Sequence, residues 1–275
     1  MKTIYLLSGV MLASTLLSAC GGSDSKPKTM SSSSSMMSSM TSSMPSSLTA
    51  SSVMPASSVG SSMAAMMDVK YSITLTNLTA GQPLSPLALT LHKPEFSAFH
   101  VGMPASIGLE KIAESGDVSE YLAAAAADAM VLSSVKADGI TMPGATSSLI
   151  LSAAVAPDMM NHLSLSLLSM LVNTNDAFTG INAINLGKLM VGESMTLDTL
   201  SYDAGTEWNS ETMATIPGPA ANGEGFNAAR DDIANQVTMH TGIVTLDDGK
   251  SDSALSNMHK WDNPVTRVTI TRMAP

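Results

Sequence analysis

The sequence predicts a mainly β protein: an antiparallel β-sandwich with one or two short helices, preceded by a disordered tether. Short apolar segments recur along residues 68–275, several of them alternate with polar residues as strands do, and turn-forming residues separate them. Helical patterns are confined to two short stretches of that region. Many short strands with few helices are typical of an antiparallel sandwich, so we expect residues 68–275 to form one such domain.

A leader occupies the N-terminus. Lys2 is followed by an apolar stretch (4–17) and by the run Leu17-Ser18-Ala19-Cys20. This arrangement is typical of a secretory signal, because the apolar stretch is too short to span a bilayer. The run resembles the lipobox of bacterial lipoproteins, which implies that residues 1–19 are a signal peptide and that Cys20 becomes the acylated first residue.

The single cysteine predicts a membrane anchor. Cys20 is the only cysteine in the chain, so it cannot form an intramolecular disulfide. Several acyl chains on one residue anchor a protein stably, and Gly21 follows instead of the aspartate associated with inner-membrane retention. We therefore expect a lipoprotein of the bacterial cell envelope, held in the outer membrane, with its domain periplasmic or surface-exposed. Ordinary secretion with an incidental cysteine is the alternative.

Residues 20–67 are dominated by Ser, Met, Pro and Thr. This composition buries too little apolar surface to offset the entropy of ordering, so we expect a disordered linker that spans about 35–40 Å. Its Met-x-x-Met spacings are those of soft Cu(I) sites, which makes copper binding an alternative function, although a biased Ser/Met repeat also produces them by chance. The methionines concerned are Met36, Met37, Met40 and Met44, followed by Met63, Met66 and Met67.

The pattern within the domain predicts each element in order. Residues 69–75 alternate apolar and polar side chains and predict the first strand. A short helix is expected over 106–114, and a capping box at Asp117 to Glu120 predicts a second helix that ends at Asp128. The other expected strands are 87–91, 130–136, 147–155, 162–172, 195–197, 200–202, 242–246 and 265–271.

Composition argues against several function classes. The formal net charge is −10 and Lys and Arg form no cluster, so we expect no nucleic-acid partner. The predicted domain has no cysteine, which excludes a disulfide framework and a zinc–thiolate site. The sequence has no phosphate-binding glycine loop, Gly-x-Ser-x-Gly elbow or His-Glu-x-x-His motif, and its five histidines are scattered. We therefore expect no enzymatic activity.

Two acidic loops follow predicted strands. Residues 173–178 come directly after the strand that ends at Val172, and residues 202–207 come shortly after Leu200. Loops at one end of a sandwich converge, so carboxylates distant in sequence can meet there. Such carboxylates repel each other unless a cation neutralises them, and oxygen ligands without His or Cys suit Ca²⁺, with Mg²⁺ or Mn²⁺ as competitors. The alternative is that these acids only form turns or cap helices.

The same loops lie within a longer resemblance, to the spondin N-terminal domain family. Tyr202-Asp203-Ala204-Gly205-Thr206-Glu207 is similar to the family's Tyr-Asp-Ala-Gly-Thr-Asp, and residues 173–180 resemble its Pro-Ser-Pro-Asp-Trp-Phe-Val-Gly segment. The resemblance extends from Tyr71 to the C-terminus. The matching segments, in family order, are 76–86, 105–117, 173–180, 202–207 and 264–270.

The resemblance implies a β-sandwich with C2-like topology, no enzymatic activity and a bound divalent cation. Carried over by position, the cation ligands are Asp176, Asp203 and Glu207. Glu207 replaces an aspartate of the family pattern, so its carboxylate reaches one methylene further. Ala177 stands where animal members carry tryptophan. Animal members act in extracellular adhesion and pattern recognition, and their partners need not be those of a bacterial protein.

These observations lead to one expected function, to which a structural role is the main rival and copper binding by the linker the other alternative. We expect a lipid-anchored β-sandwich that binds calcium at its loop end and serves as an adhesion or ligand-binding module for a glycan, a matrix component or a cell-surface protein. The rival is a purely structural cell-envelope lipoprotein without a specific ligand. Trp208 and Trp261 could form a sugar-stacking platform, although tryptophan more often serves as a buried anchor.

Overall fold

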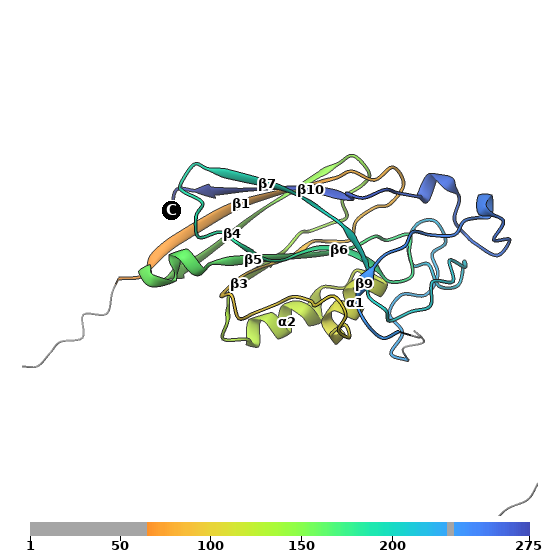
Figure 1. Ribbon diagram of the computed structural model, residues 1–275, viewed down its shortest axis with the longest axis horizontal. Coiled ribbons are helices and arrows are strands. Elements are labelled where there is room, and N and C mark those ends of the chain that lie inside the picture. Colours follow the sequence, from red (N-terminus) through yellow and green to blue (C-terminus); the bar gives the residue numbers. More distant parts are fainter. Residues whose placement is uncertain (1–64, 230–233) are drawn as a thin grey trace, which may run out of the picture. The chain divides into compact units, whose positions relative to one another are not determined.

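The computed structural model describes residues 65–229 and 234–275 (Figure 1). The predicted signal peptide, Cys20, and most of the Met-rich linker lie outside these residues. Within the described ranges, no helix is both long and apolar enough to cross a bilayer.

The domain is built from two antiparallel sheets, which confirms the predicted fold class (Figure 1). Every pair of neighbouring strands runs antiparallel. The four-stranded sheet has the order β4 (Thr146–Val155), β1 (Met67–Asn77), β10 (Thr266–Met273) and β7 (Ser194–Thr199). The six-stranded sheet has the order β3 (Val131–Lys136), β2 (Ala88–His92), β5 (Ser164–Met170), β6 (Ala177–Asn185), β8 (Ser201–Asp203) and β9 (Thr238–Met239).

The main core lies between the sheets. The alternation in β1 is confirmed: Val69, Tyr71, Ile73 and Leu75 are buried there, while the intervening residues are less buried. A second cluster around Phe178 covers the other face of the six-stranded sheet, where helices α1 (Ile107–Ser115) and α2 (Ser119–Ala127) pack. Strands in the middle of that sheet are therefore buried on both faces.

Both predicted helices are present, but the second begins differently from the prediction. Helix α1 begins after Ser106, whose hydroxyl accepts a hydrogen bond from the Leu109 amide at 3.2 Å. The capping box predicted for α2 is wrong. The cap is Val118, which makes no side-chain capping bond, and the Asp117 carboxylate accepts instead from the Ser119 amide at 2.9 Å. This is a local turn of the kind that aspartate favours, so it produces the same sequence signal.

The strand predicted over 242–246 is absent. Three backbone amides of this segment, those of Gly242, Val244 and Thr245, donate to side chains instead of to a neighbouring strand. The Gly242 amide donates to Nδ1 of His240 at 2.9 Å, and the Val244 amide donates to Oε1 of Glu211 at 3.3 Å. Leu246–Asp248 then forms a short 3-10 helix that ends at Gly249.

Strand β6 was missed, and the strand expected over 162–172 is shorter than predicted. β6 follows Asp176 directly, but its first five residues are all buried, so it lacks the polar alternation that marks a strand. β5 begins only at Ser164, because Pro157–His162 forms a 3-10 helix in front of it.

The acidic loops lie at the end of the sandwich away from the start of β1 (Figure 1). Met67 pairs with Val155 at one end of β1. At the other end, the Asn77 side chain donates to the Gln82 carbonyl at 2.8 Å, and Gln82 Oε1 accepts from the Asn173 amide at 3.0 Å. At about 3.3 Å per residue, β1 separates the two ends by roughly 35 Å.

Candidate metal centre

Asp176 occupies the last position of a tight loop between β5 and β6. The loop is closed by the Leu171 amide, which donates to the Ala177 carbonyl at 2.8 Å, and by Thr174. The Thr174 hydroxyl donates to the Leu171 carbonyl at 2.6 Å and accepts from the Ala177 amide at 3.1 Å. These bonds hold Asp176 in a fully buried position at the start of β6.

Strand pairing brings Asp203 to the same place. β6 pairs with β8 so that Ala177 lies opposite Asp203. Beyond β8 the chain turns back, and the carboxylate of Asp203 accepts from the Gly205 amide at 2.8 Å. Asp176 Oδ2 accepts from the next two amides, those of Thr206 at 2.8 Å and Glu207 at 3.2 Å. Both aspartates therefore bind consecutive amides of one turn.

Gly205 is required by the shape of this turn. Its φ is +68°, a left-handed conformation, and a Cβ at this position would lie 2.4 Å from the Gln236 carbonyl oxygen. The turn thus presses against the segment that leads into β9.

The electrostatics of Asp176 are those of a site that lacks positive charge. The pKa of Asp176 is raised to about 7, chiefly by burial and then by repulsion from Asp203, while the amides of Thr206 and Glu207 oppose the shift. Glu114 on α1 adds a smaller repulsion. Oδ2 of Asp176 is satisfied by the amides, but Oδ1 is buried without a hydrogen-bond partner. Buried polar atoms are normally paired, so this oxygen fits a cation ligand.

Glu207, the third predicted ligand, is joined to the site through its backbone. Its carboxylate oxygen Oε2 lies 3.5 Å from Nδ2 of Asn175. The second oxygen of Asp203 accepts from Asn209 Nδ2 at 2.6 Å. Across residues 65–229 and 234–275, no three His, Cys, Asp or Glu side chains form a group that could hold a metal ion. The structure thus brings Asp176 and Asp203 together and leaves the Glu207 carboxylate beside Asn175.

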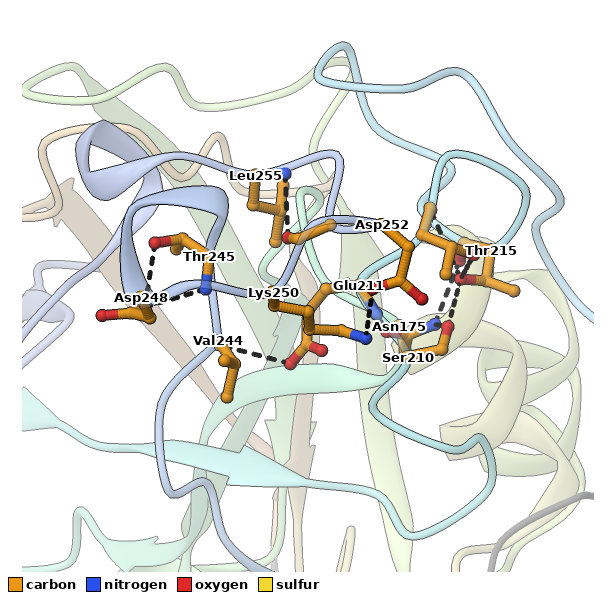
Figure 2. Close-up of polar contacts among 12 residues, drawn as sticks. Asn175, Ser210, Glu211, Thr215, Val244, Thr245, Asp248, Lys250, Asp252 and Leu255 are labelled. Carbon is orange, nitrogen blue, oxygen red and sulfur yellow. Dashed lines mark hydrogen bonds and ion pairs between the residues drawn. The ribbon is translucent and has the colours of Figure 1, made fainter. Parts of the chain in front are cut away.

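Asn175 and Glu211 link this turn to the segment after β9 (Figure 2). Asn175 is buried, and its Oδ1 accepts from the Glu211 amide at 3.1 Å. Glu211 is buried at a left-handed φ of 49°, its carbonyl accepts from Ala254, and its carboxylate accepts from Val244 at 3.3 Å. Burial raises the pKa of Glu211, and Lys250 opposes the shift. Sequence reasoning missed this link, because nothing local marks Asn175 or Glu211 as buried.

His240 lies beside the aspartates but is not a metal ligand in this arrangement. The His240 amide donates to the Ser201 carbonyl at 3.1 Å, which places the residue across from β8. Its Nδ1 accepts from the Gly242 amide, so the proton of the neutral ring is on Nε2, an atom that is buried without a hydrogen-bond partner. Burial lowers the pKa of His240, while the Asp203 charge raises it. A protonated Nε2 donates to an acceptor and does not bind a cation.

A family model described as Spondin_N matches residues 78–220, a range that includes Asp176, Asp203 and Glu207. A search of curated proteins finds no matching relative.

Proposed function

Because the chain belongs to the spondin N-terminal domain family, we propose that it is a calcium-binding, lipid-anchored module that binds a ligand at the bacterial cell envelope. Membership of the family suggests an extracellular or ligand-binding module. The calcium site, the anchor and the adhesive role are the further steps of the proposal.

One observation carries the calcium site: Oδ1 of Asp176 is buried without a hydrogen-bond partner, and Asp203 raises the pKa of the same carboxyl group. A divalent cation would satisfy the oxygen and cancel the repulsion together. Asp176 and Asp203 would bind it, and Glu207 would join them by turning its carboxylate away from Asn175. Carboxylate oxygens without His or Cys suit Ca²⁺ best, with Mg²⁺ or Mn²⁺ as competitors. A bound cation supplies positive charge and open coordination positions for a carboxylate or hydroxyl of a partner.

The place of the site within the domain supports a role in binding at a surface. The predicted anchor, Cys20, and the predicted tether precede β1, whose first residue lies at the end of the sandwich away from the acidic loops. A domain tethered in this way can direct those loops away from the membrane. The partners that we propose are a glycan, a matrix component or a cell-surface protein, and not a nucleic acid, because the chain carries a net charge of −10.

Calcium titration of the melting temperature tests the site. In the parent protein, calcium should raise the melting temperature in proportion to the logarithm of its concentration above Kd, whereas in Asp203→Ala the rise should be lost. Asp158→Ala, an exposed aspartate in the 3-10 helix before β5, is the matched control and should respond as the parent does. An equal rise in Asp203→Ala and the parent would show that the site is misassigned.

A second measurement separates a binding module from a structural spacer. Cells or purified glycans should bind the full-length protein in calcium and release it in a chelator. A spacer whose cation only stabilises the fold would show the calcium-dependent melting temperature without calcium-dependent binding.

A further inference from the structure

A cleft of about 640 Å³ lies near the loop end of the sandwich, and its wall comes from three separate segments. These are Leu78–Ala80 after β1, Thr241–Ile243 after β9, and Lys260–Asp262 before β10. The volume is within the range of about 300–1,000 Å³ that small-molecule sites have. Only the first segment lies within residues 78–220, so the cleft is formed mostly by chain beyond the family match.

Trp261 provides a fixed aromatic surface in this cleft. The indole is half-buried, and its Nε1 donates to the Ser201 hydroxyl at 3.0 Å. The ring of His240 packs against it, with centroids 5.1 Å apart and planes inclined by 50°. Part of Trp261 also contacts the main core. These contacts hold the indole in one orientation, so a ligand that stacks on it pays little entropy to order it.

The polar groups around Trp261 favour a neutral ligand. Asp262 is exposed at the rim and brings a negative charge. Lys260 is the cation in the lining, and its ammonium is already paired with the Asp248 carboxylate. Thr241 is exposed and brings a hydroxyl to the same wall. An anionic ligand would therefore meet a carboxylate without a free positive charge.

Gly242 lines the cleft beside Thr241 and adds no side chain to it. Its φ is +97°, and no atom lies within 4 Å of the position that a Cβ would occupy. The backbone here bends toward His240 and leaves free space on the side that a side chain would fill.

We propose that the cleft at Trp261 binds a neutral oligosaccharide. One sugar ring stacks its apolar C–H face on the indole, and neighbouring hydroxyls bond to the carboxylate of Asp262 and the hydroxyl of Thr241. A sugar ring has a flat apolar face surrounded by hydroxyls. A fixed aromatic ring packs on that face, and a carboxylate accepts hydrogen bonds from the hydroxyls. The inference rests on the proposed role as a ligand-binding module and names where the ligand binds and what its chemistry is.

The test is a titration of the full-length protein with three neutral trisaccharides: cellotriose, maltotriose and triacetylchitotriose. Saturation-transfer NMR and tryptophan fluorescence detect the binding. At least one should bind at millimolar concentration, and trigalacturonate, an anionic trisaccharide, should bind more weakly. Asp262→Asn should weaken binding about tenfold, the cost of losing one hydrogen bond to a charged group. Trp261→Ala should abolish binding, with circular dichroism to verify its fold, and Trp208→Ala, at a tryptophan that is 54 % exposed and outside the lining, should bind as the parent does.

The outcomes are separable from those of the calcium site. Absence of binding for all three neutral sugars, or unchanged binding in both Asp262→Asn and a folded Trp261→Ala, overturns the cleft assignment. The calcium response of the melting temperature is measured on the same samples and should be intact in Trp261→Ala and Asp262→Asn. An intact calcium response without sugar binding rejects the cleft alone, whereas sugar binding without a calcium response rejects the cation site alone.

Discussion

Asp176 and Asp203, 27 positions apart, accept hydrogen bonds from adjacent amides of a single turn. Asp203 binds the amide of Gly205, and Asp176 binds those of Thr206 and Glu207. The pairing of Ala177 with Asp203 across β6 and β8 produces this convergence. Repulsion between the two carboxylates is part of what raises the pKa of Asp176, so the turn gathers negative charge that a cation would neutralise.

Asp176→Asn should stabilise the calcium-free protein near neutral pH. The pKa of Asp176 is about 7 in the folded state, against an ordinary value of 3.8, so the folded state keeps a proton that the unfolded chain loses first. The stability contributed by this group is therefore complete at low pH and falls as pH rises between those values, by up to about 1.4 kcal/mol per pH unit.

Urea unfolding of parent and variant in chelator measures this effect. The difference in free energy of unfolding between Asp176→Asn and the parent should grow in favour of the variant from about pH 4 to about pH 7. Asp158→Asn is the control and should show a constant difference. A constant difference for Asp176→Asn as well would mean that Asp176 ionises normally in the folded protein.

Gly205→Ala should destabilise the domain and weaken calcium binding together. The added Cβ would lie 2.4 Å from the Gln236 carbonyl oxygen, in addition to the strain of a left-handed φ. Gly192→Ala is a matched control, because Gly192 has a φ of +88° but no atom within 4 Å of its Cβ position. Left-handed strain alone costs about 1–2 kcal/mol, so Gly205→Ala should lose clearly more than Gly192→Ala by thermal unfolding. Equal losses of stability in the two variants would show that the turn accommodates the added Cβ without a further loss of stability.

Asn175→Ala should lower the free energy of unfolding by about 1–3 kcal/mol, because it leaves the buried amide of Glu211 without its acceptor. Asn175→Asp keeps that acceptor but adds a negative charge beside Asp176. Calcium should therefore raise the free energy of unfolding of Asn175→Asp more than that of Asn175→Ala. Asn161→Ala, at an exposed asparagine, is the control and should change stability by less than about 0.5 kcal/mol. Equal recovery of both Asn175 variants by calcium would remove Asn175 from the neighbourhood of the cation.

Glu211→Gln should preserve the fold, and Glu211→Ala should loosen the segment after β9. The Gln side chain keeps an oxygen that can accept from the Val244 amide. It also replaces a buried carboxylate, whose pKa is raised by burial, with a neutral group. The Ala variant leaves that amide without its side-chain acceptor. Hydrogen exchange at Val244 should accelerate in Glu211→Ala relative to Glu211→Gln, and sugar binding at the Trp261 cleft should weaken in the same order. Identical exchange in the two variants would contradict the link between Glu211 and this segment.

Local pattern was sufficient for much of the fold. The period-two alternation of β1 depends on one buried and one exposed face, and that information is present in eleven consecutive residues. Helix α1 could be placed because Ser106 caps it and Gly116 ends it through local hydrogen bonds. The two acidic loops were found for the same reason, since each follows a strand.

Other elements could not be placed from local pattern. β6 is covered on both faces by other parts of the chain, which removes the polar alternation that would reveal a strand. Residues 242–246 are apolar enough to suggest a strand, but the side chains of His240 and Glu211 take up amides that a ladder would need.

The sequence by itself determined the class of the fold, its first strand and helices, and the pair of loops in which Asp176 and Asp203 lie, because these depend on periodicity and turn chemistry over a few residues. Only the tertiary structure decided that Asp176 is buried with an unpaired oxygen, that Glu207 directs its carboxylate toward Asn175, and that Trp261 lies in a cleft made by three distant segments. Burial and convergence are properties of the whole packed chain, and hydrogen bonds between residues far apart in sequence leave no local pattern.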